Sequence, residues 1–132
     1  MKKNSIKTKM IIGFALALSL LSPCSSVTAN AATSTGDYTK VYVYTSKPSG
    51  YVEGTNLTSS SKYMVVTMKW VNSNGTILET CTSKGVVAKN KYLASRDLHR
   101  EGGYAFIGAS TIKKGTSSTA SNLETVSAKK VY

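Results

Sequence analysis

Residues 62–71 constrain the fold most, because this segment carries bulky apolar side chains on both faces of an expected strand. One phase holds Met64, Val66, Met68 and Trp70, and the other holds Tyr63, Val65 and Val71. Such a strand is typical of the middle of a sheet, where both faces are covered. Asn74-Gly75 follows, and both residues tolerate the positive φ angles that tight hairpins require. The sequence therefore predicts a central strand and an antiparallel return over residues 76–83.

The remainder of the chain after residue 31 fits the same antiparallel pattern. It is rich in Thr, Ser, Val and Tyr and contains all eight tyrosines, and these residue types suit a pleated, half-buried surface. Further strands are expected over residues 38–45, 51–57, 85–88, 92–98, 104–112 and 123–131, with one helical turn as an alternative for 92–98. Small residues at Ala105, Gly108 and Ala109 predict the close approach of another sheet or loop. Six to eight short strands predict an all-β domain, a small antiparallel β-sandwich or barrel.

The first 31 residues have the parts of a secretory signal peptide. Four lysines precede an apolar stretch over residues 10–21, and Ala29-Asn30-Ala31 offers the small residues that a signal peptidase accepts. That stretch is shorter than the roughly twenty residues that span a bilayer as a helix. Lipidation at Cys24 is a weaker alternative, since Pro23 stands where a lipoprotein box has a small residue. We expect removal of residues 1–31, which leaves residues 32–132 as one secreted domain without a transmembrane segment.

The mature part is strongly basic. Thirteen of the 17 Lys and Arg residues and all 6 acidic residues follow residue 31, so its formal charge is +7. Such an excess attracts polyanions such as teichoic acids, anionic lipids or acidic glycans over a long range. The alternative is that the charge only keeps a small exported protein soluble. Nucleic acid is the least favoured partner, because export separates the chain from most of it and no reader motif is present.

Candidate catalytic groups are few. Cys81 is the only cysteine after residue 31, and it alternates in phase with Ile77, which favours a core position. His99 is the only histidine, so a Cys81/His99 pair of nucleophile and base is one alternative, without any family motif in its support. Asp97 and Glu101 are a second pair, but the alternating charges around them favour a solvated loop. The chain has too few ligands for zinc and no phosphate-binding loop. We expect no enzymatic activity, no metal and no cofactor.

Tyrosines and lysines on the same strands are the best candidates for binding. Residues 38–45 place tyrosines on one face and valines on the other, and tyrosines beside lysines hold sugars by stacking and anions by charge. The alternative is that cross-strand tyrosines only stabilise the sheet. The doublets Lys113-Lys114 and Lys129-Lys130 would join one anionic footprint if the last strand lay beside the strand over residues 104–112. The predicted contact residues are Lys40, Tyr42, Tyr44, Lys113, Lys114, Lys129 and Lys130.

Two functions fit these features. The long lysine-rich start resembles the signal peptides of Gram-positive bacteria, so the first function is a secreted cationic domain that binds anionic or glycan components of a cell envelope. The second is a bacteriocin or toxin, because a cleaved signal and a small, β-rich, aromatic and serine-rich domain resemble the lactococcin 972-type bacteriocins. This chain departs from their Trp- and His-rich composition and aromatic C-terminal ending, having only Trp70, His99 and a lone Tyr132. Growth inhibition of neighbouring cells would separate the two functions.

Overall fold

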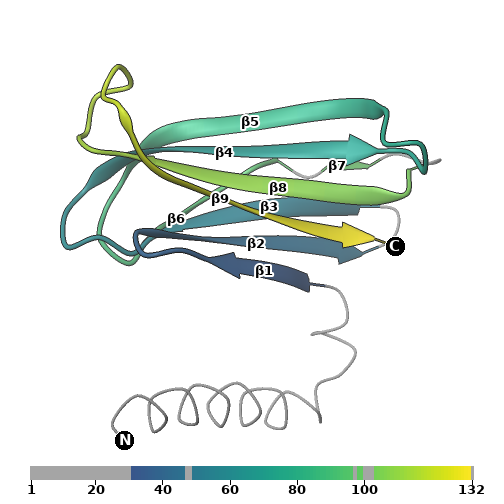
Figure 1. Ribbon diagram of the computed structural model, residues 1–132, viewed down its shortest axis with the longest axis horizontal. Helices are drawn as coiled ribbons and strands as arrows, with labels where there is room; N and C mark the ends of the chain where they lie inside the picture. The colour runs from purple at the N-terminus through teal and green to yellow at the C-terminus, as the bar shows by residue number, and fades with distance from the viewer. Residues whose placement is uncertain (1–30, 47–48, 97, 100–102, 132) are drawn as a thin grey trace, which may run out of the picture.

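The computed structural model describes residues 31–132 apart from 47–48, 97, 100–102 and 132. Its regular elements are all strands (Figure 1). Their bounds are β1 Ala31–Thr35, β2 Thr39–Ser46, β3 Ser49–Asn56, β4 Lys62–Val71, β5 Ile77–Val87, β6 Tyr92–Ala94, β7 Leu98–His99, β8 Ala105–Lys113 and β9 Asn122–Val131. Within the described residues, no helix is long and apolar enough to cross a membrane. Residues 1–30 of the predicted signal peptide lie outside the described residues.

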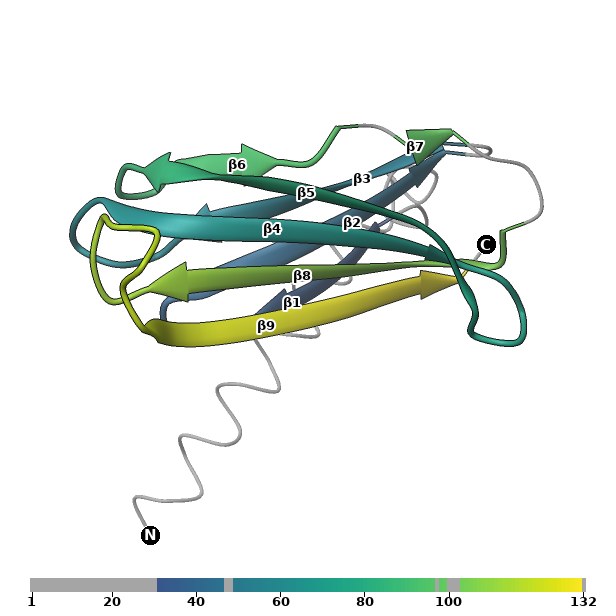
Figure 2. The same ribbon diagram turned by 90° about the horizontal axis from the view of Figure 1, so that it is seen from above.

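The strands form two antiparallel sheets that pack face to face as a sandwich. Sheet A has the order β1-β2-β3-β6, and the two-residue strand β7 also pairs with β3. Sheet B has the order β5-β4-β8-β9. Seen from above, β2 and β3 run at an angle behind β4 and β8 (Figure 2). The predicted all-β sandwich is therefore confirmed, and β4 is central in its sheet as its two bulky faces indicated.

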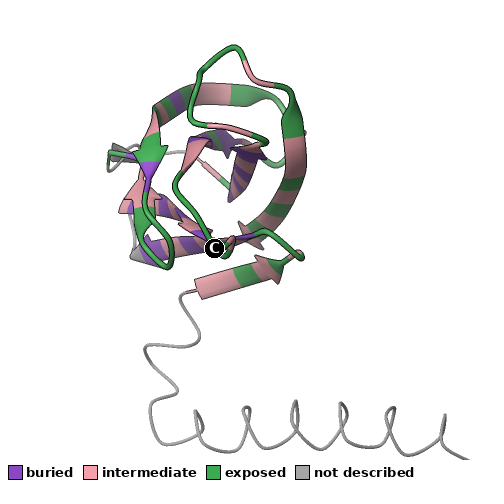
Figure 3. Cartoon of the chain, turned by 90° about the vertical axis from the view of Figure 1, so that its left-hand side faces the viewer, coloured by how far each residue is buried: buried purple, intermediate pink, exposed green. Residues whose placement is uncertain are grey.

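The core lies between the sheets and follows the period-two alternation of the strands. Buried and more exposed residues alternate along each ribbon (Figure 3). The main cluster is made by Val41, Val43 and Val52 from sheet A and by Val66, Met68, Trp70, Cys81 and Phe106 from sheet B. The rings of Trp70 and Phe106 lie 3.9 Å apart between centroids. Because alternate side chains point to opposite faces, the residues between these core positions form the two outer surfaces of the sandwich.

Gly108 marks a close approach of the two sheets, as the small residues around it predicted. A Cβ atom at this position would lie 2.6 Å from Val43 Cγ2 and 2.8 Å from Val52 Cγ1, which is closer than packed carbon atoms lie in a protein interior. Ala105 is also buried, whereas Ala109 is half-buried on the outward phase. The absence of a side chain at Gly108 therefore lets β8 approach the valines of β2 and β3.

The hairpin between β4 and β5 forms where Asn74-Gly75 predicted it, but through a longer loop. Gly75 has φ of 82°, whereas Asn90 is the one described non-glycine residue with positive φ, so Asn74 does not adopt it. Asn72 organises the loop, since its Oδ1 accepts hydrogen bonds from the backbone N–H groups of Asn74 and Thr76. A bulge between Trp70 and Val71 sets the register that follows.

Several strands differ from the predicted ones. The two strands expected over 76–83 and 85–88 are one continuous strand, β5, because Gly85 keeps the ladder by pairing with Met64. Residues 92–98 are divided between β6 and β7. Strand β1 was not predicted, since its small residues show no apolar alternation, and it forms as an edge strand through its pairing with β2.

Candidate binding faces

The outward side of sheet A carries a cluster that we call the tyrosine face. Tyr42 and Tyr44 alternate along β2 with the fully buried Val41 and Val43, so they point away from the core. The pairing of β2 with β3 sets Tyr44 opposite Tyr51 and Tyr42 opposite Glu53. The next row pairs Lys40 with Thr55 and Thr55 with Tyr92. The tyrosine face consists of Lys40, Tyr42, Tyr44, Tyr51, Glu53 and Tyr92.

The rings of this face form a continuous ladder. The ring centroids of Tyr42 and Tyr44 lie 5.9 Å apart with planes inclined by 24°, and those of Tyr44 and Tyr51 lie 4.7 Å apart with planes inclined by 15°. Lys40 extends the ladder, because its Nζ lies 4.3 Å from the centroid of Tyr42. Three of the predicted contact residues, Lys40, Tyr42 and Tyr44, are thus brought together. Tyr44 and Tyr51 form a cross-strand pair, which is the kind of contact that the alternative interpretation, stabilisation of the sheet, requires.

Tyr44 and Glu53 are electrostatically coupled within the ladder. Burial, followed by the nearby Glu53 carboxylate and the neighbouring phenols, raises the pKa of Tyr44 to about 12. Burial raises the pKa of Glu53, and a side-chain hydrogen bond with Tyr44 partly offsets that increase. The Tyr44 hydroxyl is therefore the donor, and the Glu53 carboxylate the acceptor, of the hydrogen bond between them. Glu53 is fixed beside the rings as a hydrogen-bond acceptor.

The two basic doublets do not form one footprint. Strand β9 does lie beside β8, as the hypothesis required, but the strands are antiparallel. Lys113 pairs with Asn122 at one end of the hairpin, whereas Lys129 pairs with Ile107 near the other. Lys113 is six positions along β8 from Ile107, which corresponds to about 20 Å. The hairpin therefore keeps the doublets apart.

Within each doublet, the two lysines also differ. Lys113 Nζ donates hydrogen bonds to Ala120 O at 2.9 Å and to Asn122 Oδ1 at 3.3 Å, so this side chain holds the β8–β9 loop. Lys129 is exposed on the outward side of sheet B, and its Nζ lies 5.9 Å from the ring centroid of Tyr104. Lys130 is half-buried and in register with Phe106, on the phase that faces sheet A. Lys114 is exposed after the end of β8.

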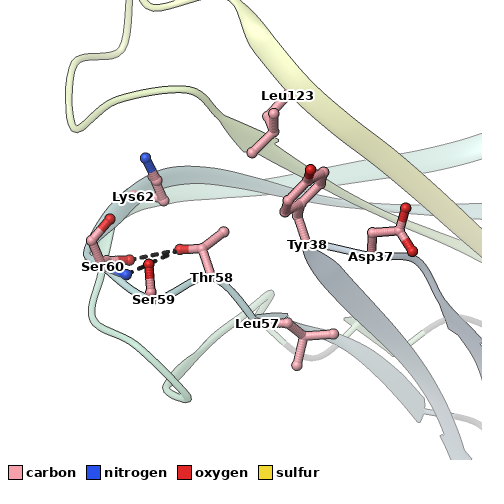
Figure 4. A pocket seen from close by; sticks show the side chains of 8 residues that line it. All are labelled: Asp37, Tyr38, Leu57, Thr58, Ser59, Ser60, Lys62 and Leu123. Carbon is pink, nitrogen blue, oxygen red and sulfur yellow. Dashed lines mark hydrogen bonds between the residues drawn. The ribbon is translucent and has the colours of Figure 1, made fainter.

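A shallow depression of about 340 Å³ lies at one end of the sandwich (Figure 4). Its lining comes from the β1–β2 turn, the β3–β4 loop and the start of β9, and consists of Asp37, Tyr38, Leu57, Thr58, Ser59, Ser60, Lys62 and Leu123. The buried Asn56 holds the loop, because its Nδ2 donates to Ser60 O and Val87 O. Lys62 Nζ donates to Lys114 O at 2.6 Å. The polar groups of this depression mainly fix loops.

Glu124 fixes the β1–β2 turn beside this depression. Its carboxylate accepts hydrogen bonds from the backbone N–H groups of Asp37, Tyr38 and Thr39 at 2.8–2.9 Å. Burial acts to raise the pKa of Glu124, but the three backbone hydrogen bonds together hold it below its ordinary value. A Cβ atom at Gly36 would collide with this carboxylate. The turn therefore depends on both Gly36 and an ionised Glu124.

The proposed catalytic alternatives gain no support from the described residues. Cys81 has 7% of its surface exposed and packs in the core with a free thiol, as predicted. The phase that it shares with Ile77 does not explain this position, because Ile77 is 50% exposed beyond the bulge between Trp70 and Val71. Asp97 and Glu101 lie outside the described residues, and His99 is described only as part of the β7 backbone. The described residues contain no group of three or more His, Cys, Asp or Glu side chains that would hold a metal ion.

Sequence reasoning missed Tyr51 and Glu53, which complete the tyrosine face. The predicted turn placed Ser49 and Gly50 outside a strand, whereas the structure pairs Ser46 with Ser49 and begins β3 there. The pairing of Ser46 with Ser49 is what sets Tyr51 opposite Tyr44. The hairpin register was thus the missing information.

Comparisons with known proteins do not assign a family. No protein-family model matches this chain, and no curated protein matches it. Among solved structures, a penta-heme cytochrome c552 from Thermochromatium tepidum has a TM-score of 0.49 at 7% identity over 77% of this chain and 38% of the cytochrome. A β-glucuronidase from Bacteroides uniformis has a TM-score of 0.45 at 13% identity over 78% of this chain and 13% of the enzyme. An endonuclease/exonuclease/phosphatase from Beutenbergia cavernae has a TM-score of 0.43 at 13% identity over 77% of this chain and 26% of that protein. This chain thus spans well under two thirds of each of these proteins.

Proposed function

We propose that this protein is a small secreted, non-catalytic domain that binds a polysaccharide of a cell envelope through its tyrosine face. One observation carries the proposal: β2 and β3 bring Lys40, Tyr42, Tyr44 and Tyr51 into one ladder on an outward sheet surface, with Glu53 beside it. The ligand class is an extended glycan, because the cluster lies on an open sheet face and follows two strands. A small enclosed molecule would require a deeper cavity.

The chemistry of the tyrosine face suits sugars. Tyrosine offers an apolar ring and a polar hydroxyl, so one side chain contacts both the C–H surface and the hydroxyl groups of a pyranose. Lys40 is a hydrogen-bond donor at one end of the ladder, and Glu53 is an acceptor beside its middle. The mutual packing of the rings restricts their rotamers before a ligand arrives. Binding to such a preorganised surface costs little conformational entropy.

The proposed absence of catalysis also has physical support. Most glycoside hydrolases use two carboxyl groups that flank the scissile bond. Among the described carboxylates, Glu53 is on the tyrosine face, Glu124 is committed to the β1–β2 turn, and Glu79 lies 3.2 Å from Arg96. A single carboxylate whose hydrogen bond is shared with Tyr44 suits the positioning of sugar hydroxyls rather than acid–base cleavage. Export is supported by the signal-like first 31 residues.

The test is co-sedimentation of the protein with Gram-positive cell walls from which teichoic acid has been removed. The full-length chain is expressed in a secreting Gram-positive host and purified from the medium, and N-terminal sequencing of the product checks the expected start at Ala32. We expect saturable binding that changes little between about 0.05 and 0.5 M salt, since ring and hydrogen-bond contacts at short range are weakly screened. The double variant Tyr42→Ala/Tyr51→Ala should lose at least tenfold in affinity.

The matched control is Tyr104→Ala, which removes an exposed tyrosine that directly precedes β8 of the other sheet. It should bind the stripped wall like the unmodified protein. Equal losses in the two variants, with both proteins folded by circular dichroism, would contradict a glycan site on the tyrosine face. Retained binding by Tyr42→Ala/Tyr51→Ala would contradict it as well.

A further inference from the structure

The outward side of sheet B, on the opposite surface of the sandwich from the tyrosine face, carries a different kind of cluster. Lys69 on β4 pairs with Ile107 on β8, and Ile107 pairs with Lys129 on β9. Lys84 on β5 pairs with Val65, four residues along β4 from Lys69. All three lysines are exposed, and they alternate with inward residues of the core. We call the outward residues Lys69, Lys84 and Lys129, with the threonines between them, the lysine face.

The spacing of these lysines follows from the sheet geometry. Lys69 and Lys129 are two strands apart, which corresponds to about 10 Å, and Lys84 lies about 14 Å from Lys69. No described side chain forms an ion pair or hydrogen bond with Lys69 or Lys84. The ammonium groups therefore remain available to an external anion.

The described carboxylates are all placed elsewhere. Glu53 belongs to the tyrosine face, Glu124 and Asp37 to the β1–β2 turn, and Glu79 contacts Arg96. Glu79 is in register with Trp70 and therefore shares the inward phase of sheet B. Within the described part of the chain, the lysine face thus has positive charges without a compensating carboxylate. This segregation concentrates the positive potential of a protein whose mature part has a formal charge of +7.

One pair of threonines lies in the row between Lys69 and Lys84, and a second pair lies in the row of Lys84. Thr67 and Thr82 lie across neighbouring strands with their hydroxyl oxygens 3.4 Å apart, and the hydroxyl oxygens of Thr111 and Thr125 lie 2.8 Å apart. Each hydroxyl can donate to only one acceptor but has two lone pairs, so the pairs can turn a donor toward an incoming oxygen. The surface is the outward face of a sheet, which suits an extended chain of anions.

We propose that the lysine face is a second binding site, for a linear phosphodiester polymer such as a glycerol-phosphate teichoic acid. Lysine is a strongly hydrated point charge that suits phosphate oxygens, and the threonine hydroxyls supply neutral donors between the lysines. The site is separate from the proposed glycan site, so the protein can hold two envelope polymers at once and link them. Binding of the phosphodiester polymer uses different residues from the proposed function and can fail independently of it, whereas the linking of two polymers rests on the proposed function.

The experiment measures binding of the full-length, secreted protein to purified glycerol-phosphate teichoic acid as a function of salt. Three ammonium–phosphate contacts correspond to a slope of about −2 in a plot of log affinity against log salt, so a tenfold rise in salt should weaken binding about 100-fold. The variant Lys69→Glu/Lys129→Glu should lose more than tenfold in affinity at low salt and should show a slope near zero. Its binding to teichoic-acid-free wall should be unchanged, which separates this site from the tyrosine face.

The matched control is Lys89→Glu/Lys91→Glu, because it reverses two exposed charges in the β5–β6 turn and changes the net charge equally. We expect it to lose less than threefold. Equal losses in both double variants would overturn the proposal, since net charge alone would then account for binding. A salt-independent affinity would also overturn it. Binding to vesicles of anionic phospholipid without binding to the polymer would also overturn the proposal, because the partner would then be a membrane surface.

Discussion

The two outer faces of this sandwich arise from the same alternation of side chains along the strands, but their side chains are arranged differently. On the tyrosine face, the side chains contact one another, with ring centroids 4.7 and 5.9 Å apart and Lys40 Nζ 4.3 Å from a ring. On the lysine face, the charged side chains stand apart among threonines. A packed ladder gives short-range recognition with little salt dependence, whereas separated charges give long-range attraction that salt screens. The comparison teaches that one small domain can divide these two tasks between its surfaces.

The comparison also separates residues that a charge count treats as equal. Lys40 lies over a tyrosine ring, Lys113 holds a loop, and Lys129 is exposed on an outward face. The Nζ of Lys129 lies 5.9 Å from the centroid of the Tyr104 ring, compared with 4.3 Å from Lys40 Nζ to Tyr42, so its ammonium group is held less closely. The chemical role of a lysine in this protein therefore follows from its strand, phase and end of the hairpin rather than from its presence in a basic doublet.

The largest effect should come from breaking the core that both faces share. Trp70 has 1% of its surface exposed and packs against Phe106, so Trp70→Ala should lower the free energy of unfolding by about 3–5 kcal/mol. Denaturant titration followed by circular dichroism measures this loss. Because the two sheets hold each other in place, both binding activities should disappear at the same denaturant concentration. Survival of one activity after loss of the other would show that the faces fold separately.

A smaller effect should come from the turn that Glu124 holds. Its pKa in the folded protein lies below its ordinary value, so its contribution to stability is complete above about pH 5 and is lost as the pH falls through the folded pKa. Glu124→Gln should lower the free energy of unfolding at pH 7 by about 1–3 kcal/mol, since it weakens charge-assisted hydrogen bonds. Its stability should also fall less than that of the unmodified protein between pH 5 and pH 3. If the free energy of unfolding falls equally in the two proteins between pH 5 and pH 3, this role of Glu124 is contradicted.

Tyr44→Phe should have a still smaller effect on the free energy of unfolding, and it tests the hydrogen bond between Tyr44 and Glu53 on the tyrosine face. The folded pKa of Tyr44 is about 12, above the unfolded value of about 10, so the stability that accompanies this shift is complete below pH 10 and is lost as the pH rises toward 12. Removal of the hydroxyl should cost about 0.5–1.5 kcal/mol at pH 7, the usual contribution of one hydrogen bond. Ultraviolet titration should show one late-ionising phenol fewer. The pKa of Glu53 should rise, because its hydrogen bond from Tyr44 is lost.

The smallest effect on stability should come from the exposed lysines. Lys129→Glu and Lys114→Glu should each change the free energy of unfolding by less than about 0.5 kcal/mol, as surface substitutions usually do. Lys113→Glu should cost more, because Lys113 Nζ donates to Ala120 O and Asn122 Oδ1 across the β8–β9 loop. Thermal melts of the three variants make the comparison. Equal melting temperatures would show that the contacts of Lys113 contribute nothing to stability.

Much of the fold was predictable because bulky residues alternate strongly in the central strands. Strand β4 has the predicted bounds, and Trp70 lies in the core as the phase of this strand predicted. The core position of Cys81 was also predicted, but Ile77, the residue that set its phase, is 50% exposed. Strand β1 was not predictable in the same way, because its Ala, Ser and Thr residues carry no apolar pattern and its pairing is a tertiary event. The prediction divided the single strand β5 because glycine is uncommon inside strands, yet Gly85 pairs with Met64 in the ladder.

The candidate sites were predictable only in part, because a site on a sheet face depends on register between strands. The local sequence of β2 placed Lys40, Tyr42 and Tyr44 together, since alternation needs no tertiary information. Glu53 and the lysine face require knowledge of which residues lie opposite one another on neighbouring strands. The supposed footprint of the two basic doublets failed for the same reason: adjacency of β8 and β9 was correct, but their antiparallel direction separates Lys113 from Lys129.

The central claim is that the two faces bind two polymers independently, and a retention assay tests it most directly. Fluorescent glycerol-phosphate teichoic acid is mixed with teichoic-acid-free wall, with and without the protein, at about 0.05 M salt, and the label that sediments with the wall is measured. We expect protein-dependent retention of the label, which should be lost in Tyr42→Ala/Tyr51→Ala and in Lys69→Glu/Lys129→Glu but kept in Lys89→Glu/Lys91→Glu. If teichoic acid instead displaces the protein from the wall, the two polymers compete for one site and the account is contradicted.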